Sequence, residues 1–412
     1  MRLLVIGLTL LGAAAAAEPA GPRPAAEGTA LIEALEAAPL GVVGTIEGCT
    51  ALDARSWRAT VAVESALVGS AEPGKRIVIA WEELASTRPP RFANGDRVLL
   101  ALERLAAGSL WRKRFEDPRE LSSVHGVAQR GAAFLRMPAP GSVSILQHYL
   151  LLPADLRAGP AGQRHLIALA ADAQRPLALS AARRLAALAS GAPLGAEDAA
   201  LVLSALARAE SDAELATSLL SWIERRQPLG LIPALDAAQG VPAGAPAIFV
   251  RARGRLGEGL PGERERALLA SPSAALRAAA ADVAGPAQIA RLAELVRGDR
   301  VPDVRLAALK RLARLDAAAA LEPLLAAFAD ADAAVRNAAA LHVAAFGPEV
   351  VPRLREAAGR PWPAPQSAVL GLSHANSEES RAALAELAEE HPDERVRTLA
   401  AVALGRPIGH AD

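Results

Sequence analysis

A pattern that recurs about every 30 residues in the C-terminal part of the chain constrains the fold more than any other feature. Each copy opens with an apolar residue and an arginine, and small or apolar residues follow four and eight positions later. The opening pairs are Leu276-Arg277, Val304-Arg305, Val335-Arg336 and Val396-Arg397. Successive pairs lie 28, 31 and 61 residues apart, so the last step equals two periods. Repetition at this length is typical of stacked helical hairpins.

Positions i, i+4 and i+8 share one face of a helix, so each copy predicts a helix with one buried stripe. The residues at i+4 are Ala280, Ala308, Ala339 and Ala400, and those at i+8 are Ala284, Leu312, Val343 and Leu404. Alanine at i+4 would let neighbouring backbones approach closely. A second helix is expected after each first helix, starting at Ile289, Ala320, Val351 and Ser380.

The starts of these first helices carry capping signals. Ser273, Asp332 and Asp393 stand three residues before the apolar position of their copies, where a side-chain oxygen can accept from free amides of the first turn. In the remaining copy Val301 takes this place, and Pro302 follows it. Proline suits a first helical position. The local signals therefore agree with the periodic ones.

The repeats resemble HEAT-like repeats, in the short form named from phycobilisome lyases, over residues 271–347 and 391–405. The unit between these ranges is degenerate, because its first helix near APQSAVLGL lacks the Val-Arg pair. Amphipathic segments upstream extend the predicted repeat domain to 142–412, as a right-handed α-α superhelix. The resemblance implies a structural Asp-Arg ladder between units rather than ligand binding, involving Arg277, Arg305, Arg336 and Arg397. The bilin attachment performed by the lyases is not implied by the repeat alone.

The first residues resemble a secretory signal peptide. Met1-Arg2 is a minimal basic start, an apolar run follows, and small residues end in A-x-A before Glu18. We expect a signal peptide over 1–17, a flexible Pro/Ala/Gly leader over 18–27, and a periplasmic or secreted mature protein. The alternatives are an uncleaved anchor or a fortuitous apolar start. The stretch is short of the ~20 residues that a spanning helix needs. No integral membrane segment is expected in the mature chain.

Residues 28–140 have a different pattern, with several short β-type runs separated by turn-rich segments such as SAEPGKR and ANGD. In SWRATVAVESAL, Trp57, Ala59, Val61 and Val63 alternate with polar or small residues. These runs predict a small antiparallel β-barrel or sandwich. Their order resembles the OB-like barrels of netrin-type modules. The expected fold class is therefore α+β and multidomain, with a β-rich domain at 28–140 followed by the helical repeats.

The search for chemistry is negative. The histidines are scattered, no cysteine–histidine spacing fits zinc, and nucleophile, P-loop and dinucleotide motifs do not occur. We therefore expect no catalytic residues, no metal and no cofactor. The single cysteine, Cys49, is interpreted as a buried or half-buried strand residue rather than a reactive thiol. Basic and acidic residues balance at 45 each, which argues against a nucleic-acid partner.

One candidate contact surface lies on the β-domain. Trp and Arg are enriched at interface hot spots, and two loop-like segments combine them. The candidate residues are Trp81, Arg88, Arg91, Phe92, Trp111, Arg112, Lys113 and Arg114. The alternative is that the aromatic residues, together with Phe115, fill the barrel ends or the domain junction. This alternative is favoured, because a chain with 3% aromatic residues needs most of them for its core.

Two classes of function remain open. The first is an exported, non-catalytic scaffold that binds a protein partner through the solenoid surface. The second is an exported enzyme or enzyme-accessory protein with a site at the junction of the β-domain and the solenoid. An enclosed cleft with perturbed acid–base groups would favour the second class.

Overall fold

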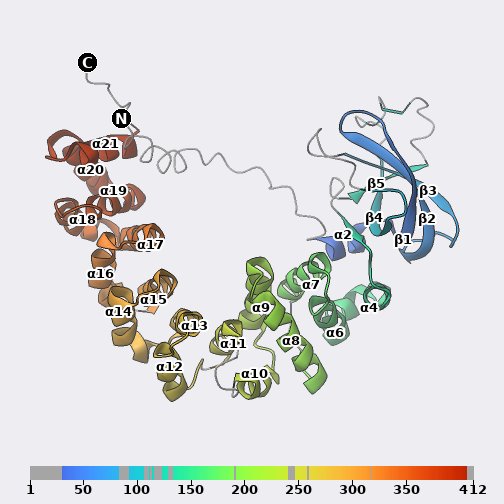
Figure 1. Ribbon diagram of the computed structural model, residues 1–412, viewed down its shortest axis with the longest axis horizontal. Coiled ribbons are helices and arrows are strands. Elements are labelled where there is room, and N and C mark those ends of the chain that lie inside the picture. The colour runs from blue at the N-terminus through green and yellow to red at the C-terminus, as the bar shows by residue number, and fades with distance from the viewer. Residues whose placement is uncertain are drawn as a thin grey trace. The chain divides into compact units, whose positions relative to one another are not determined.

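The computed structural model divides the chain into two compact units, an N-terminal unit up to Gly230 and a C-terminal unit from Leu231 (Figure 1). It describes residues 30–82, 92–105, 111, 114–115, 123–128, 133–189, 192–239, 246–257, 259–315 and 317–405. The predicted signal peptide (1–17) and leader (18–27) lie outside these residues.

The N-terminal unit contains a closed five-stranded β-barrel with one additional strand. The strands are β1 (Leu40–Ala51), β2 (Ser56–Val68), β3 (Arg76–Glu82), β4 (Arg97–Arg104), β5 (Val124–Val127) and β6 (Phe134–Arg136). Their order is β1-β2-β3-β5-β4, and β4 pairs back onto β1 to close the barrel, while β6 adds to β4. All pairs are antiparallel except β3–β5, which is parallel. The prediction of a small barrel is confirmed, with this one parallel pair.

Alternation along the long strands builds the barrel core. In β2 the side chains of Ala59, Val61 and Val63 are buried, as the sequence pattern predicted, while Trp57 is half-buried. Gly44 in β1 permits the close approach of β2, because a Cβ atom there would lie 2.5 Å from the carbonyl oxygen of Ala62. Cys49 is half-buried and packs against the same core.

A short helix precedes the barrel within the range that the sequence predicted to be β-rich. This helix, α2 (Leu31–Ala37), packs against β4 and against α7 (Arg175–Ala187). Leu31, Ile32 and Leu35 are buried, and the amide of Ile32 donates to the Ser180 hydroxyl at 2.9 Å. Residues near the start of the predicted β-domain therefore belong to the packing of the helices.

A polar cluster ties α2 to the following helices. The Tyr149 hydroxyl donates to Glu36 at 2.6 Å, and Arg184 donates to the same carboxylate at 3.2 Å. Burial and the bond to Glu36 raise the pKa of Tyr149. Glu33 accepts from Ser180 at 3.1 Å. Burial, followed by the nearby Glu36 carboxylate, raises the pKa of Glu33 above its ordinary value of 4.5, against hydrogen bonds from its own backbone and Ser180 and the positive charge of Arg184.

This arrangement predicts a pH effect for Glu33→Gln. A carboxyl with a raised pKa stabilises the fold below its unfolded pKa, and that contribution is lost as the pH rises through the folded pKa. The melting temperature of Glu33→Gln relative to wild type should therefore rise between pH 4.5 and neutral pH. Thermal unfolding across this window measures the difference. Glu72→Gln, at an exposed position, is the control. If the difference in melting temperature from wild type stays constant with pH for Glu33→Gln as it does for the control, the prediction is contradicted.

The helices of the N-terminal unit follow directly after β6. They are α4 (Pro140–Leu151), α5 (Ala154–Arg157), α6 (Pro160–Ala170), α7, α8 (Ala196–Ala209) and α9 (Ala213–Arg226). Gln174 joins the two parts of the unit, because its side-chain amide donates to the carbonyls of Arg136 and Met137 at 3.0 and 3.1 Å. Strands thus give way to helices between Arg136 and Pro140.

The C-terminal unit is a stack of helix pairs in two layers. Its helices are α10 (Leu231–Gln239), α11 (Ala247–Gly254), α12 (Gly262–Leu269), α13 (Ala274–Val283), α14 (Ile289–Gly298), α15 (Pro302–Leu315), α16 (Ala317–Ala326), α17 (Ala333–Ala344), α18 (Val351–Ala358), α19 (Ala364–Ala375), α20 (Glu378–Glu390) and α21 (Glu394–Ala403). The first helices, α13, α15, α17, α19 and α21, contact one another in sequence. Figure 1 shows α13, α15 and α17 along the inner side of this curved unit.

The predicted register of the repeats is confirmed. Val304, Val335 and Val396 are fully buried, and the alanines four residues after each of them are equally buried. Leu276 at the start of the first copy and Leu404 at the end of the last are only half-buried.

The capping predictions are also confirmed. Asp332 accepts from the amides of Ala334 and Val335, and Ser273 and Asp393 accept from first-turn amides of α13 and α21. Pro302 is the first residue of α15.

An Asp-Arg ladder links successive first helices. Arg277 binds the Asp299 carboxylate with two hydrogen bonds of 2.7 and 2.9 Å, and Arg305 binds Asp330 with two of 2.7 Å. Each aspartate also serves the next unit, because its backbone carbonyl accepts from the arginine six residues later. Arg305 therefore donates in two directions, to the Asp330 carboxylate in the turn that follows its own unit and to the Asp299 carbonyl in the turn that precedes it.

The ladder is confirmed for Arg277 and Arg305 but stops at the degenerate unit, because Arg336 and Arg397 donate to backbone carbonyls and pair with no carboxylate among the described residues. Arg397 keeps the bond to the carbonyl six residues earlier, at 2.7 Å, but that residue is His391. A ring nitrogen of His391 contacts the carbonyl of Ala358 at 3.1 Å. His391 thus takes the position that Asp299 and Asp330 hold in the regular units. An aspartate at this position would have no arginine to bind, because the preceding first helix, α19, contains none.

The ladder predicts a stability loss for Arg305→Met. Burial alone would raise the pKa of Asp330, but bonds from Arg305 and from the Asp332 amide outweigh it and hold the pKa below its ordinary value of 3.8. Loss of this charged pair should cost about 2 kcal/mol at neutral pH. Because the pKa is depressed, the difference from wild type should shrink as the pH falls below 3.8.

Urea unfolding at two pH values measures this effect, and Arg297→Met, at an exposed position of α14, is the matched control. A difference that grows on acidification would contradict the ladder.

Candidate binding surfaces

Two of the predicted contact residues lie in the barrel core. Trp81 at the end of β3 and Phe92 are 1% and 0% exposed. Their ring centroids are 4.8 Å apart in an edge-to-face arrangement, and Phe92 packs in the same way on Phe134 at 4.9 Å. Aromatic pairs prefer this geometry. Neither side chain is presented to a partner, and both fill the barrel, as the alternative interpretation of the sequence expected.

Trp111 and Arg114 lie together at the barrel rim. The Arg114 guanidinium stands 5.0 Å from the centroid of the Trp111 ring. The same guanidinium pairs with Asp53 at 2.8 Å and with Glu82 at 3.0 Å, so its charge is balanced within the barrel. Trp111 is half-buried and packs beside Phe115. The ion pairs of Arg114 connect this segment to the strands, and part of the Trp111 indole stays accessible.

The four remaining candidate contact residues are not among the residues that the structure describes. Arg88, Arg91, Arg112 and Lys113 lie outside the described residues. The structure therefore brings Trp81 together with Phe92, and Trp111 with Arg114, in two separate environments. A contact role for the set as a whole stays a prediction.

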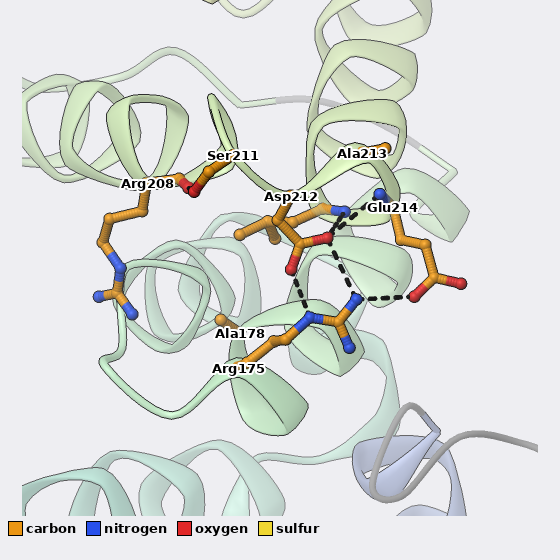
Figure 2. Close-up of a pocket in the computed structure, with 8 residues that line it drawn as sticks. Arg175, Ala178, Arg208, Ser211, Asp212, Ala213 and Glu214 are labelled. Atoms are coloured by element: carbon orange, nitrogen blue, oxygen red, sulfur yellow. Dashed lines mark hydrogen bonds and ion pairs between the residues drawn. The ribbon is translucent and has the colours of Figure 1, made fainter.

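A groove that the sequence did not predict lies among the helices of the N-terminal unit. It measures about 490 Å³ and is formed where the start of α7 faces the turn from α8 to α9. Figure 2 shows its lining residues, which are Arg175, Ala178, Arg208, Ser211, Asp212, Ala213, Glu214 and Leu215.

The acidic and basic side chains of this groove are paired with each other. Arg175 bonds to both oxygens of Asp212 and, at 2.9 Å, to Glu214 (Figure 2). Asp212 also caps α9, accepting from the amides of Glu214 and Leu215. The bond from Arg175 holds the pKa of Asp212 below its ordinary value, against the effect of burial. Asp212 is therefore a carboxylate at neutral pH.

The remaining polar groups of the groove hold the turn. Arg208 donates to the carbonyls of Ala171 and Asp172 at the end of α6. The Ser211 hydroxyl donates to the carbonyl of Arg208 at 3.5 Å, rather than to a base. No histidine, cysteine or lysine is among the lining residues. The arrangement offers polar contacts to a ligand but does not assemble a nucleophile with a base.

The sequence contained a signal for this groove. Asp212 precedes the amphipathic segment AELATSLLSWIERR as Asp332 precedes α17, and both cap the following helix. The amphipathic segment was predicted, but its capping aspartate and the arginine that binds it were not. Arg175 lies 37 residues before Asp212, a spacing that differs from those of the regular repeats.

Two histidines of the N-terminal unit also lie close together. The rings of His148 on α4 and His165 on α6 stack at a centroid distance of 6.3 Å. Burial, followed by the nearby His148, lowers the pKa of His165. Among the described residues, no three acidic, histidine or cysteine side chains are grouped to hold a metal ion. Nor does any described helix combine the length and apolar character needed to cross a bilayer.

Comparison with known proteins adds no assignment. No protein-family profile and no curated protein sequence matches this chain.

Proposed function

We propose that this chain is an exported, non-catalytic protein that binds another protein through the surface of its helix stack. The observation that supports the proposal most is that the buried and half-buried charged side chains bind one another or the backbone. The arginines and aspartates of the ladder, and those of the groove, are engaged in holding helices together. The exposed residues of the first-helix layer remain for contacts with a partner, and stacked repeats form extended surfaces of this kind.

We further propose that the helix pairs are HEAT-like repeats and that the barrel is OB-like. The ladder supports the first assignment, because bonds between successive units are what the resemblance implies. The strand order β1-β2-β3-β5-β4, closed through β4–β1, supports the second assignment. OB folds are five-stranded barrels of this small size.

Export rests on the first residues of the sequence, namely the Met1-Arg2 start and the small residues before Glu18. N-terminal sequencing of protein from the periplasm or culture medium tests it. A mature terminus within a few residues of Glu18 is expected. An intact Met1 in the exported product would remove the signal-peptide assignment.

The alternative is an exported enzyme or enzyme-accessory protein with a site where the barrel meets the first helices. Acid–base groups do gather near this place, with Glu36, Tyr149 and Arg184 as the central members. Their side chains hydrogen-bond to each other and hold α2 in place. This mutual pairing favours a structural role and supports the binding protein over the enzyme.

Affinity capture tests the proposed function. The mature chain, tagged at its C-terminus, is crosslinked in a periplasmic extract, and bound proteins are quantified with and without an excess of untagged chain. A protein partner captured saturably and displaced by the untagged chain is expected. An Ala339→Asp chain, in which the stack should be disrupted, is the control. Absence of any displaceable protein, with conversion of a small molecule by the purified chain, would favour the enzyme.

A further inference from the structure

A basic patch lies on the first-helix layer of the C-terminal unit. Lys310 and Arg314 are one helical turn apart on α15, and both side chains are exposed. Residues at this spacing share a helix face. Arg311 lies beside them, half-buried, and donates to the carbonyl of Ala284 at 2.7 Å. This bond fixes one guanidinium at the base of the patch and leaves Lys310 and Arg314 projecting from it.

The neighbouring helix α17 adds an apolar element. Leu341 is 54% exposed and so presents apolar surface beside the cations of α15. Leu341 stands six residues after Val335, just as Lys310 stands six residues after Val304, so they occupy matching places on adjacent helices. Packed helices lie about 8–10 Å apart. Lys310 and Leu341 therefore occupy neighbouring positions on adjacent helices of the first-helix layer.

His342, the residue after Leu341, senses the charges of the same cations. Burial lowers the pKa of the half-buried His342, and the positive charges of Arg314 and Lys310 lower it further. The two cations of α15 thus act on a side chain of α17. We name Lys310, Arg311, Arg314, Leu341 and His342 the α15–α17 patch.

The carboxylates nearest the patch, Asp282 and Glu265, act on the half-buried Arg311, although burial outweighs them and lowers the pKa of that guanidinium. Asp282 occupies the matching place on α13, but it faces Arg251 at 3.8 Å and Arg255 at 3.6 Å. Within the described ranges, neither Lys310 nor Arg314 forms an ion pair with a carboxylate. The whole chain carries equal numbers of basic and acidic residues, 45 of each, so the patch is a local excess rather than a general property.

We propose that the α15–α17 patch docks an acidic segment of a partner protein. Carboxylates of the segment pair with Lys310 and Arg314, and an apolar side chain of the segment covers Leu341. This inference rests on the proposed function and names the surface and the chemistry of its partner. Charge complementarity selects an acidic occupant. The exposed leucine and the neutral overall charge favour a protein segment over nucleic acid, which would require a wider basic surface.

Binding of defined peptides tests the docking chemistry. The probe is a fluorescein-labelled peptide of glutamate and leucine, compared with glutamine–leucine and lysine–leucine peptides of equal length. Fluorescence anisotropy with the full mature chain gives the dissociation constants at low and high salt. We expect the glutamate–leucine peptide to bind most tightly and to weaken as salt increases. Equal affinity for the glutamine–leucine peptide, or tighter binding of a single-stranded DNA of equal charge, would overturn the proposal.

Charge reversal locates the binding. Lys310→Glu with Arg314→Glu should weaken the glutamate–leucine peptide about tenfold or more, since rim charges govern such encounters. The matched control is Arg297→Glu with Arg381→Glu, which makes the same charge change at exposed positions of α14 and α20. Unchanged melting temperatures establish that both variants fold. Should the reversal perturb folding, Lys310→Gln with Arg314→Gln provides the milder test. An equal loss in the control would overturn the assignment to this patch.

The capture experiment separates this inference from the proposed function. If the charge-reversed chain captures the same partner as wild type without loss, the patch is not the docking surface, while the proposed function stands. If wild type captures no displaceable protein, the proposed function fails, and the peptide measurements still decide whether the patch binds acidic chains. Loss of capture only on reversal of Lys310 and Arg314 supports both.

Discussion

Replacing Ala339 by aspartate will lower the free energy of unfolding of the C-terminal unit by about 3–5 kcal/mol, the range seen when a buried charge lacks a partner. Ala339 lies on α17 and is fully buried. Its small side chain allows the neighbouring helices to approach, so a carboxylate there has neither space nor a hydrogen-bond donor. Urea unfolding followed by circular dichroism at 222 nm, the helical band, measures the loss.

Two further variants make this result specific. Leu312→Asp places the same charge in the same stripe one repeat earlier, where the leucine is 1% exposed, and should cost a similar amount. Arg381→Ala changes an exposed residue of α20 and should shift stability by less than about 0.5 kcal/mol. Similar melting behaviour for the three variants would contradict the repeat register.

Replacing Trp81 by alanine will destabilise the barrel by about 3–5 kcal/mol, because the substitution leaves a large cavity in a closed core. The indole is 1% exposed and packs edge-to-face on Phe92. Loss of near-ultraviolet circular dichroism at a lower denaturant concentration, with little change in the helical signal at that point, would report the barrel specifically.

Trp111→Ala is the informative comparison for this prediction. Trp111 is half-buried at the rim, so its removal should cost less than the removal of Trp81. A Trp81→Ala chain with wild-type stability and reduced partner capture would instead assign Trp81 to a contact surface. A stability loss with unchanged capture by the residual folded protein would assign it to the core alone.

The sequence predicted the helix stack well because its determinants are local and repeated. An apolar residue and an alanine one turn later recur in every copy, and a capping serine or aspartate recurs in three of the four. Burial of Val304, Ala308 and Val335 follows from helix geometry alone. The arginine ladder was available only through resemblance, because the sequence does not reveal which aspartate an arginine reaches across a helix pair.

The features that the sequence did not predict depend on contacts between distant segments. Helix α2 was included in a β-rich range because seven residues with no capping side chain give little periodic signal. Its place is fixed by Ser180, 148 residues away. The groove at Arg175 likewise requires a pairing with Asp212 across an irregular spacing. For the aromatic residues of the barrel, composition favoured the core, and the burial of Trp81 and Phe92 agrees with that preference.

The double role of the ladder aspartates has a consequence for how this chain can change in length. Each arginine reaches a carbonyl six residues before it, and in Asp299 and Asp330 that same residue carries the carboxylate for the preceding unit. The six-residue interval is therefore fixed from both sides. The length of the full repeat is not fixed in this way, since successive copies start 28 and 31 residues apart. Insertions and deletions should be tolerated in the connections within helix pairs and excluded from the turns between pairs. The turns therefore set the spacing between successive units of the stack.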